Sequence, residues 1–135
     1  TYQSTEDMVG ANIAVEAESA GQKAVEADEN LSQAEMVAVG AQSDTLMEVA
    51  AGTSDVAVID AVMAYASVGE GTSYSDLVVV DGIELGKEEY GIGFRKGSNL
   101  VEAVNTALQE LTDEGVLDEL QQKYPSVLVT LEKSA

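Results

Sequence analysis

The fold is decided by residues 53–65, which read TSDVAVIDAVMAY. Residues 56–59 form a short, continuous apolar run rich in β-branched side chains, and the turn residue Gly52 precedes them. Such a run is typical of a strand buried on both faces of a parallel sheet. Asp60 stands where this strand ends and a helix over residues 61–67 begins. A carboxylate there is either a helix N-cap or a ligand contact, because ligands of open α/β sheets bind at the carboxyl ends of strands.

Working outward from this stretch, three further runs have the same apolar character. They predict strands at residues 12–16, 36–39 and 77–80. Because helical patterns with short connections separate the runs, the order is β-α-β-α-β-α-β. That order predicts an α/β domain with a parallel-type sheet and helices on both faces.

The helix before each of the middle strands begins with a capping signal. Ser19 is the predicted N-cap of a helix that runs to about Asn30, and Gln22 follows at the spacing of a capping box. Ser43 is the predicted N-cap of the next helix, which Gly52 ends.

The character of the chain changes after residue 86. Residues 90–96, YGIGFRK, alternate in polarity and end in two bases, whereas the part before them is strongly acidic. Ser98 is the predicted N-cap of a long amphipathic helix that Gly115 stops, and a short helix over residues 116–123 follows. The chain therefore divides into an α/β part and a helical C-terminal part.

Composition excludes several classes of function. The chain of 135 residues has 25 acidic and 6 basic side chains, a formal net charge of −19, which repels nucleic acid and anionic membranes and attracts cations. Cysteine and histidine are absent, which removes thiolate catalysis and the commonest general base and metal ligand. No cofactor and no metal site are predicted.

Three motifs along the chain resemble those of the polar-amino-acid solute-binding proteins of ABC transporters, which belong to the type II periplasmic binding protein family. The strongest is YGIGFRKGS at residues 90–98, followed by an amphipathic helix and LTDEGVLDELQQKY at residues 111–124. SDVAVID at residues 54–60 is the second, and SAG at residues 19–21 is the third. The resemblance extends over nearly the whole chain.

The resemblance also implies how the chain is organised. Such proteins have two lobes, joined by two crossing strands, that close around the ligand. Residues 1–86 resemble lobe two, and residues 87–135 resemble a crossing strand and the C-terminal helices that normally return to lobe one. Because the N-terminal part of lobe one has no counterpart here, we expect a single-lobe, incomplete form that binds its ligand weakly.

By this resemblance, the expected function is binding of a polar amino acid for ABC-transporter uptake, with the permease as a partner of the full protein. The expected location is extracellular or periplasmic, with a lipid anchor as an option for the full-length protein. We do not expect an enzyme, although a dehydratase-like enzyme on the same fold is one alternative. A sensory or receptor domain is the other. A permease and an ATPase encoded beside the chain would favour transport.

The same resemblance assigns candidate ligand contacts. Asp60 matches the carboxylate that pairs with the ligand's α-ammonium group, and its alternative role is a plain N-cap. Ser19, Ala20 and Gly21 match the turn whose N–H groups meet the α-carboxylate, and the alternative is an ordinary capped helix. At Glu18 the family usually has glycine, so this turn departs from the pattern.

Glu16 matches a position that often faces the ligand side chain. If it does so here, it favours a cationic side chain such as that of lysine or arginine. The alternative is a solvated acid at the end of a strand.

The long helix after Ser98 predicts an association. Leu100, Val104, Leu108 and Leu111 form one apolar stripe, and burying each such side chain contributes roughly 1.5–3 kcal/mol. Without its usual partner lobe, the stripe either folds back on residues 1–86 or packs against a second copy. We favour a homodimer through residues 87–135, opposed by the like charge of the chains.

Overall fold

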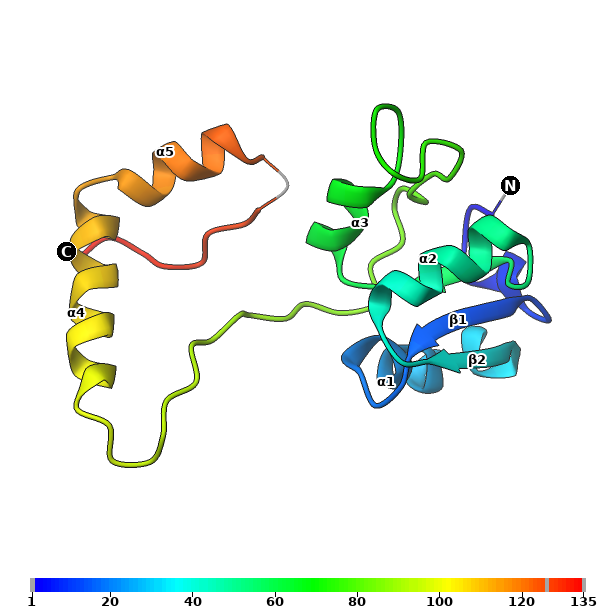
Figure 1. Ribbon diagram of the computed structural model, residues 1–135, viewed down its shortest axis with the longest axis horizontal. Coiled ribbons are helices and arrows are strands. Elements are labelled where there is room, and N and C mark those ends of the chain that lie inside the picture. Colours follow the sequence, from blue (N-terminus) through cyan, green and yellow to red (C-terminus); the bar gives the residue numbers. More distant parts are fainter. Residues whose placement is uncertain (1, 126, 135) are drawn as a thin grey trace. The chain divides into compact units, whose positions relative to one another are not determined.

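The computed structural model describes residues 2–125 and 127–134, which form two compact units. Unit 1 is Thr1–Lys87 and unit 2 is Glu88–Ala135. Figure 1 shows the sheet and its helices in unit 1 and two helices in unit 2.

Unit 1 is built on a three-stranded parallel sheet. Its strands are β1 (Asn12–Glu16), β2 (Glu35–Val39) and β3 (Val56–Val58), in the order β2-β1-β3. Ile13 of β1 pairs with Met36 on one side and Val56 on the other. The central strand is the most deeply buried, because Ile13, Ala14 and Val15 are completely covered. This confirms the predicted α/β fold with a parallel sheet.

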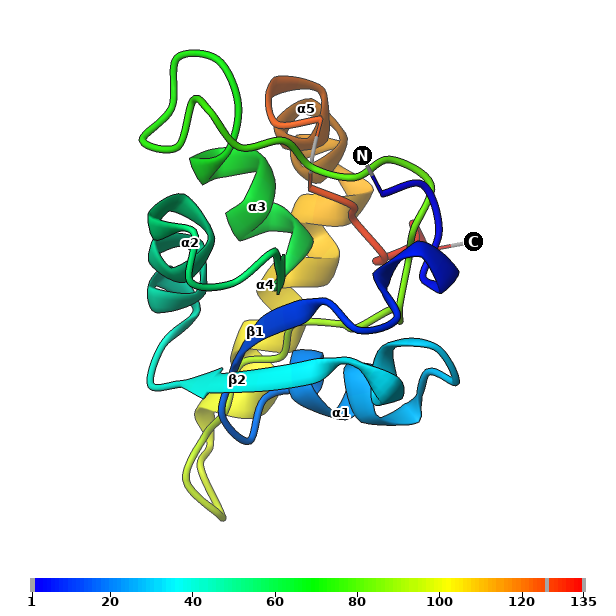
Figure 2. The ribbon, with the colours of Figure 1, turned by 90° about the vertical axis from the view of Figure 1, so that its right-hand side faces the viewer.

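Helices lie on both faces of that sheet. They are α1 (Ala20–Ala27), α2 (Gln42–Ala51) and α3 (Ala61–Ser67), with short 3-10 turns at Glu6–Met8 and Leu31–Gln33. Figure 2 shows α1 on one side of β1 and β2, with α2 and α3 on the other. The connection from β1 to β2 crosses the sheet in one direction and that from β2 to β3 in the opposite direction. Since such connections are right-handed, their helices fall on opposite faces.

The core of unit 1 gathers around β1. Besides residues of β1, the buried cluster contains apolar side chains from the two 3-10 turns and from α1. The members are Met8, Ala11, Ile13, Val15, Val25 and Leu31. Ile83 and Leu85, near the end of unit 1, pack against this cluster and tie the last stretch of the unit to the sheet.

Three details differ from the sequence prediction. Residues 77–80 form no strand, although their composition favours one, because a strand needs a neighbour to satisfy its backbone groups and none of the described strands pairs with them. The first helix ends at Ala27 and not near Asn30. The next residue, Asp28, ends it because its Oδ1 accepts hydrogen bonds from the backbone N–H groups of Asn30 and Leu31, which turns the chain. Ser43 lies inside α2, whose N-cap is Ala41.

Unit 2 is a pair of helices, α4 (Leu100–Asp113) and α5 (Val116–Lys123), which pack against each other. Gly115 joins them with φ of 82°, a left-handed conformation that glycine adopts at little cost. Residues 90–96, predicted to be a crossing strand, lie in no helix or strand. The predicted cap Ser98 does accept a hydrogen bond, from the backbone N–H of Leu100 at 3.2 Å, although Asn99 is the N-cap residue.

Candidate functional site

The candidate site lies at the carboxyl edge of the sheet in unit 1. Since β1, β2 and β3 are parallel and adjacent, they end at the same edge, and a helix begins after each of them. Neighbouring strands lie about 4.8 Å apart, so the residues that follow them come close together. This edge is where open α/β sheets bind their ligands.

Ser19 caps α1 as the sequence predicts. Its Oγ accepts a hydrogen bond from the backbone N–H of Gln22 at 3.1 Å. Gln22 reciprocates, because its Oε1 accepts from the backbone N–H of Glu18 at 2.7 Å. Glu18 has φ of 61°, which makes it the single non-glycine residue with positive φ in the described part of the chain. The turn thus takes the conformation for which glycine is best suited.

The first N–H groups of α1 are available to a ligand. The backbone N–H groups of Ala20 and Gly21 donate no hydrogen bond to any described residue, as geometry dictates for a helix N-terminus. Both point along the helix axis toward the positive end of its dipole, where anions are stabilised. A carboxylate is therefore the ligand group that suits this turn.

Gly21 places this turn against the end of β3. A Cβ atom added at Gly21 would lie 3.1 Å from the carbonyl oxygen of Val58, which is tighter than an ordinary contact. Glycine here permits α1 to approach β3 closely. The Ala20 and Gly21 amides thus lie beside the strand that leads, two residues later, to Asp60.

Asp60 is the N-cap of α3, which confirms one of the two roles that the sequence allows. Its Oδ1 accepts a hydrogen bond from the backbone N–H of Met63 at 3.0 Å. Its own backbone N–H donates to Oε1 of Gln42, also at 3.0 Å. The second carboxylate oxygen, Oδ2, accepts no hydrogen bond from the described residues, and the side chain is half-buried. One oxygen thus holds the helix while the other remains open to a cation.

Gln42 is the residue that the sequence analysis missed. It is the first residue of α2 and links that helix to the end of β3 through the bond to Asp60. Its position three residues after the end of β2, at the start of a helix, is the available signal, since every helix at this edge begins after a strand. The predicted cap Ser43 is its neighbour in the sequence.

Glu16, the last residue of β1, lies between the ends of β2 and β3. Its side chain is half-buried and makes no hydrogen bond or ion pair with described residues. Its backbone carbonyl accepts from the N–H of Ser19 at 3.3 Å, which fixes the turn into α1. Glu16 therefore sits in the middle of the edge, next to the Ser19 turn.

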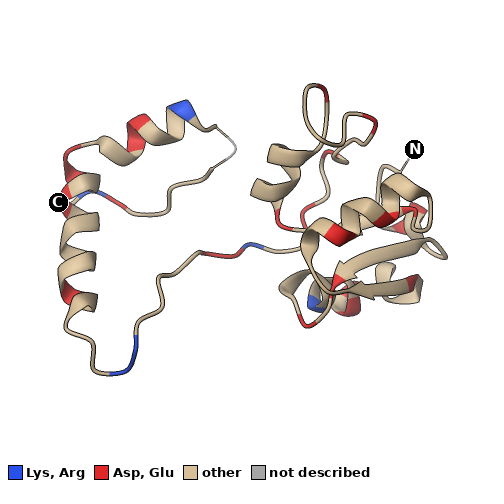
Figure 3. Cartoon of the chain, in the orientation of Figure 1, with Lys and Arg blue, Asp and Glu red and all other residues tan. Residues whose placement is uncertain are grey.

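The edge combines two opposite preferences within one small region. The N–H groups of Ala20 and Gly21 attract an anion, whereas the carboxylates of Asp60 and Glu16 attract cations. Figure 3 shows further acidic residues over the elements of unit 1, where Lys23 and Lys87 are the basic side chains. The surroundings thus favour a ligand with a net positive charge.

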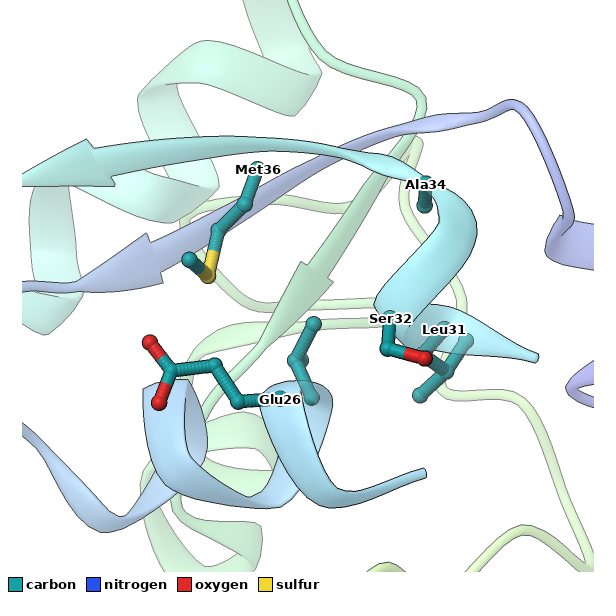
Figure 4. A pocket seen from close by; sticks show the side chains of 6 residues that line it. Glu26, Leu31, Ser32, Ala34 and Met36 are labelled. Carbon is teal, nitrogen blue, oxygen red and sulfur yellow. The ribbon is translucent and has the colours of Figure 1, made fainter. Parts of the chain in front are cut away.

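A hollow of unit 1 lies away from the carboxyl edge, between α1, β2 and the turn Leu31–Gln33. This shallow groove of about 260 Å³ is lined by Val25, Glu26, Leu31, Ser32, Ala34 and Met36. Figure 4 shows the side chains of Glu26 and Met36 pointing toward each other across it. Glu26 already accepts a hydrogen bond from the side-chain amide of Gln22 at 2.8 Å. With no free donor gathered in it, the groove is a weaker candidate than the carboxyl edge.

No family model, curated protein or solved structure matches this chain. Among the described residues, no group of three or more carboxylates could hold a metal ion. No described helix has the length and apolar character needed to cross a membrane. The observations that bear on function are therefore the geometry of the carboxyl edge and the resemblance of the sequence motifs.

Proposed function

We propose that unit 1 binds a free polar amino acid at the carboxyl edge of its sheet. The observation that carries this proposal is the pairing of a free N–H turn with a half-buried carboxylate on adjacent strand ends. The amides of Ala20 and Gly21 are the receptor for the α-carboxylate, and Oδ2 of Asp60 is the receptor for the α-ammonium group. An amino acid zwitterion carries these two charges on one carbon atom.

The ligand side chain has its own contact in this proposal. Glu16 lies next to the Ser19 turn, at the end of β1, and favours a basic side chain, such as that of lysine or arginine. The strongly acidic surroundings act in the same direction. The proposed ligand class is therefore a polar, preferably cationic, amino acid.

The motif resemblance supports a role of this binding in transport. In a polar-amino-acid uptake system, the complete two-lobed protein would deliver the amino acid to an ABC permease outside the cytoplasm. A single edge covers one side of a ligand, whereas ordinary pockets bury about 70–90% of a small ligand's surface. Weak binding by the present chain follows from this, as does rapid release.

The test is a titration of the isotopically labelled chain with free lysine, arginine and glutamine, followed by amide chemical shifts. We expect saturable shifts at Ala20, Gly21 and Asp60, strongest with the basic amino acids. The methyl ester of lysine has no α-carboxylate, and Nα-acetyl-lysine has no α-ammonium group but keeps the ammonium group of its side chain. Since each modified ligand loses one of the two contacts, both should bind at least about tenfold more weakly, equivalent to 1.4 kcal/mol.

The matching variant is Asp60→Asn. Asparagine caps helices about as well as aspartate, so the stability of α3 is retained while the charge that receives the ammonium group is lost. We expect the affinity for lysine to fall at least about tenfold. Asp76→Asn, at an exposed loop position without a hydrogen bond in the described structure, is the control and should bind normally. Equal affinities of the two variants would refute the ammonium contact.

A further inference from the structure

The sheet of unit 1 stops at β3 with an open edge. Among the described residues, β3 pairs with β1 alone, and no strand is bonded to its other side. An outer strand presents a row of backbone N–H and C=O groups that can pair with another chain. β3 reads VAV and contains no charge and no proline, the usual devices that prevent such pairing.

Residues 90–96 have the properties of a strand that lacks a sheet. They follow each other as YGIGFRK and lie outside every helix and strand of the described structure. In an extended segment successive side chains point to opposite faces, so Ile92 and Phe94 share an apolar face while Gly91 and Gly93 share the other. Ile92 is 63% exposed, which leaves this apolar face largely in water.

The charges at the two places are complementary. Asp55 stands directly before β3 and Asp60 stands two residues after it. Arg95 and Lys96 end the exposed segment, and neither forms an ion pair within the part of the chain described. If the added strand runs parallel to β3, its basic end lies near Asp60; if it runs antiparallel, its basic end lies near Asp55. The other outer strand, β2, begins with Glu35 but is followed by Gly40 and Ala41, so it offers a carboxylate at its amino end alone.

We propose that residues 90–96 of one copy add as a strand to the outer edge of β3 in a second copy. Each copy has the outer edge of β3 and one such segment outside its helices and strands, so a mutual exchange covers the β3 edge of both copies. Such a contact closes at two copies because the same two surfaces are used by each partner. Backbone hydrogen bonds supply the pairing, and the face of Ile92 and Phe94 adds apolar contact.

Net charge sets the conditions under which the dimer forms. Two chains of formal charge −19 repel each other, and this repulsion extends over roughly 10 Å at about 0.1 M salt but over roughly 30 Å at about 0.01 M. The dimer should therefore be populated at moderate salt and should weaken as salt is removed.

Sedimentation velocity over a concentration series at moderate salt tests the proposal. We expect a reversible monomer–dimer equilibrium for the natural chain. Ile92→Pro removes a backbone donor and prevents strand pairing, so it should raise the dimer dissociation constant at least about tenfold. Leu128→Pro is the control, because Leu128 is also apolar, 73% exposed and outside the helices and strands of unit 2. It should dimerise as the natural chain does.

Amide exchange supplies a second readout at the two surfaces. On dimerisation, the amides of β3 and of residues 90–96 should exchange more slowly as the protein concentration rises. A monomer at every concentration would overturn the proposal, even one whose residues 90–96 are protected by pairing within the same chain. A dimer that Ile92→Pro leaves intact would overturn it as well, and would assign the association to another surface such as that of α4.

Discussion

The two units use similar apolar side chains in opposite ways. In unit 1, β1 lies between two strands and between helices on both faces, so Ile13, Ala14 and Val15 are completely buried. In unit 2, two helices pack as a single layer, and Thr112, at 4% exposed, is the one buried residue among the described residues of that unit. Leu100 in the stripe of α4 remains 55% exposed.

This contrast shows that burial depends on the number of layers more than on the composition of a segment. An amphipathic helix covers its apolar stripe only if another layer faces it, and stable domains contain at least two such layers. Unit 1 has three layers, helix, sheet and helix. We therefore locate the stability of the chain in unit 1.

The largest expected effect follows directly from this contrast. Ile13→Ala removes a completely buried side chain from the central strand and should lower the free energy of unfolding by about 2–5 kcal/mol. Val101→Ala in α4 removes a side chain that is 40% exposed and should change it by less than about 0.5 kcal/mol. Urea denaturation followed by circular dichroism measures both. Equal losses would show that unit 2 has a core of its own.

The fold of unit 1 could be predicted because its signals are local. The apolar runs that form β1, β2 and β3 are short and β-branched, and the capping residues Ser19 and Asp60 mark where helices begin. Residues 77–80 show the limit of such signals. Their composition is that of a strand, but a strand also needs a neighbour, and pairing is a property of the whole sheet rather than of a segment.

The candidate site could be predicted in part. The resemblance to solute-binding proteins assigns ligand contacts to Ser19, Ala20, Gly21, Glu16 and Asp60, and for Asp60 the end of a predicted strand indicates the same role. Gln42 was missed, since its bond to the backbone of Asp60 joins residues eighteen positions apart and leaves no trace in either local pattern. The close approach of Gly21 to Val58 is likewise visible only in three dimensions.

A smaller effect is expected from the left-handed backbone that both units contain. Both units have glycine at such positions, as at Gly52 and Gly115, but unit 1 also places Glu18 at φ of 61°. A left-handed backbone conformation costs a residue with a side chain roughly 1–2 kcal/mol, and replacement by glycine removes this cost. Glycine is also freer in the unfolded chain, which lowers the net stabilisation by about 0.4–1 kcal/mol. Glu18→Gly should therefore stabilise the chain by up to about 1 kcal/mol, because the bond from its N–H to Gln22 is retained.

Thermal unfolding measures this gain, with Glu70→Gly as the control. Glu70 also lies in an exposed turn of unit 1 and has no positive φ, so its replacement brings no relief of strain and should be neutral or slightly destabilising. A melting temperature of Glu18→Gly at or below that of Glu70→Gly would show that the Glu18 turn is not strained.

The smallest expected effect concerns the C-terminal segment, which unit 2 holds by exposed polar contacts instead of a core. Oδ1 of Asp113 accepts a hydrogen bond from the backbone N–H of Ser134 at 2.7 Å. Lys133 Nζ lies 2.8 Å from Oδ2 of Asp118. The hydrogen bond from the Ser134 N–H holds the pKa of Asp113 below its ordinary value of 3.8, and the hydrogen bond that Lys133 donates to Asp118 raises the pKa of Lys133 above 10.5.

The sign of each shift fixes a pH window for this segment. Since the pKa of Asp113 is lowered by folding, its contribution is present above pH 3.8 and is lost as the pH falls through the folded value. Since the pKa of Lys133 is raised by folding, its contribution to stability is present below pH 10.5 and is lost as the pH rises through the higher pKa of the folded chain. The segment should thus stay attached between these limits and detach locally outside them, while unit 1 keeps its buried strand.

A pH titration of the Ser134 amide proton shift measures the acid limit, because that proton loses its charged acceptor when Asp113 is protonated. We expect a midpoint below 3.8 in the natural chain. Asp113→Asn should abolish this transition and leave the alkaline one, which depends on Lys133 and Asp118. A Ser134 midpoint at or above 3.8 would mean that the segment is not held by Asp113. The contacts of Lys133 with Asp118 and of Gln109 with the carbonyl oxygen of Glu132 would then be the ones that hold the segment.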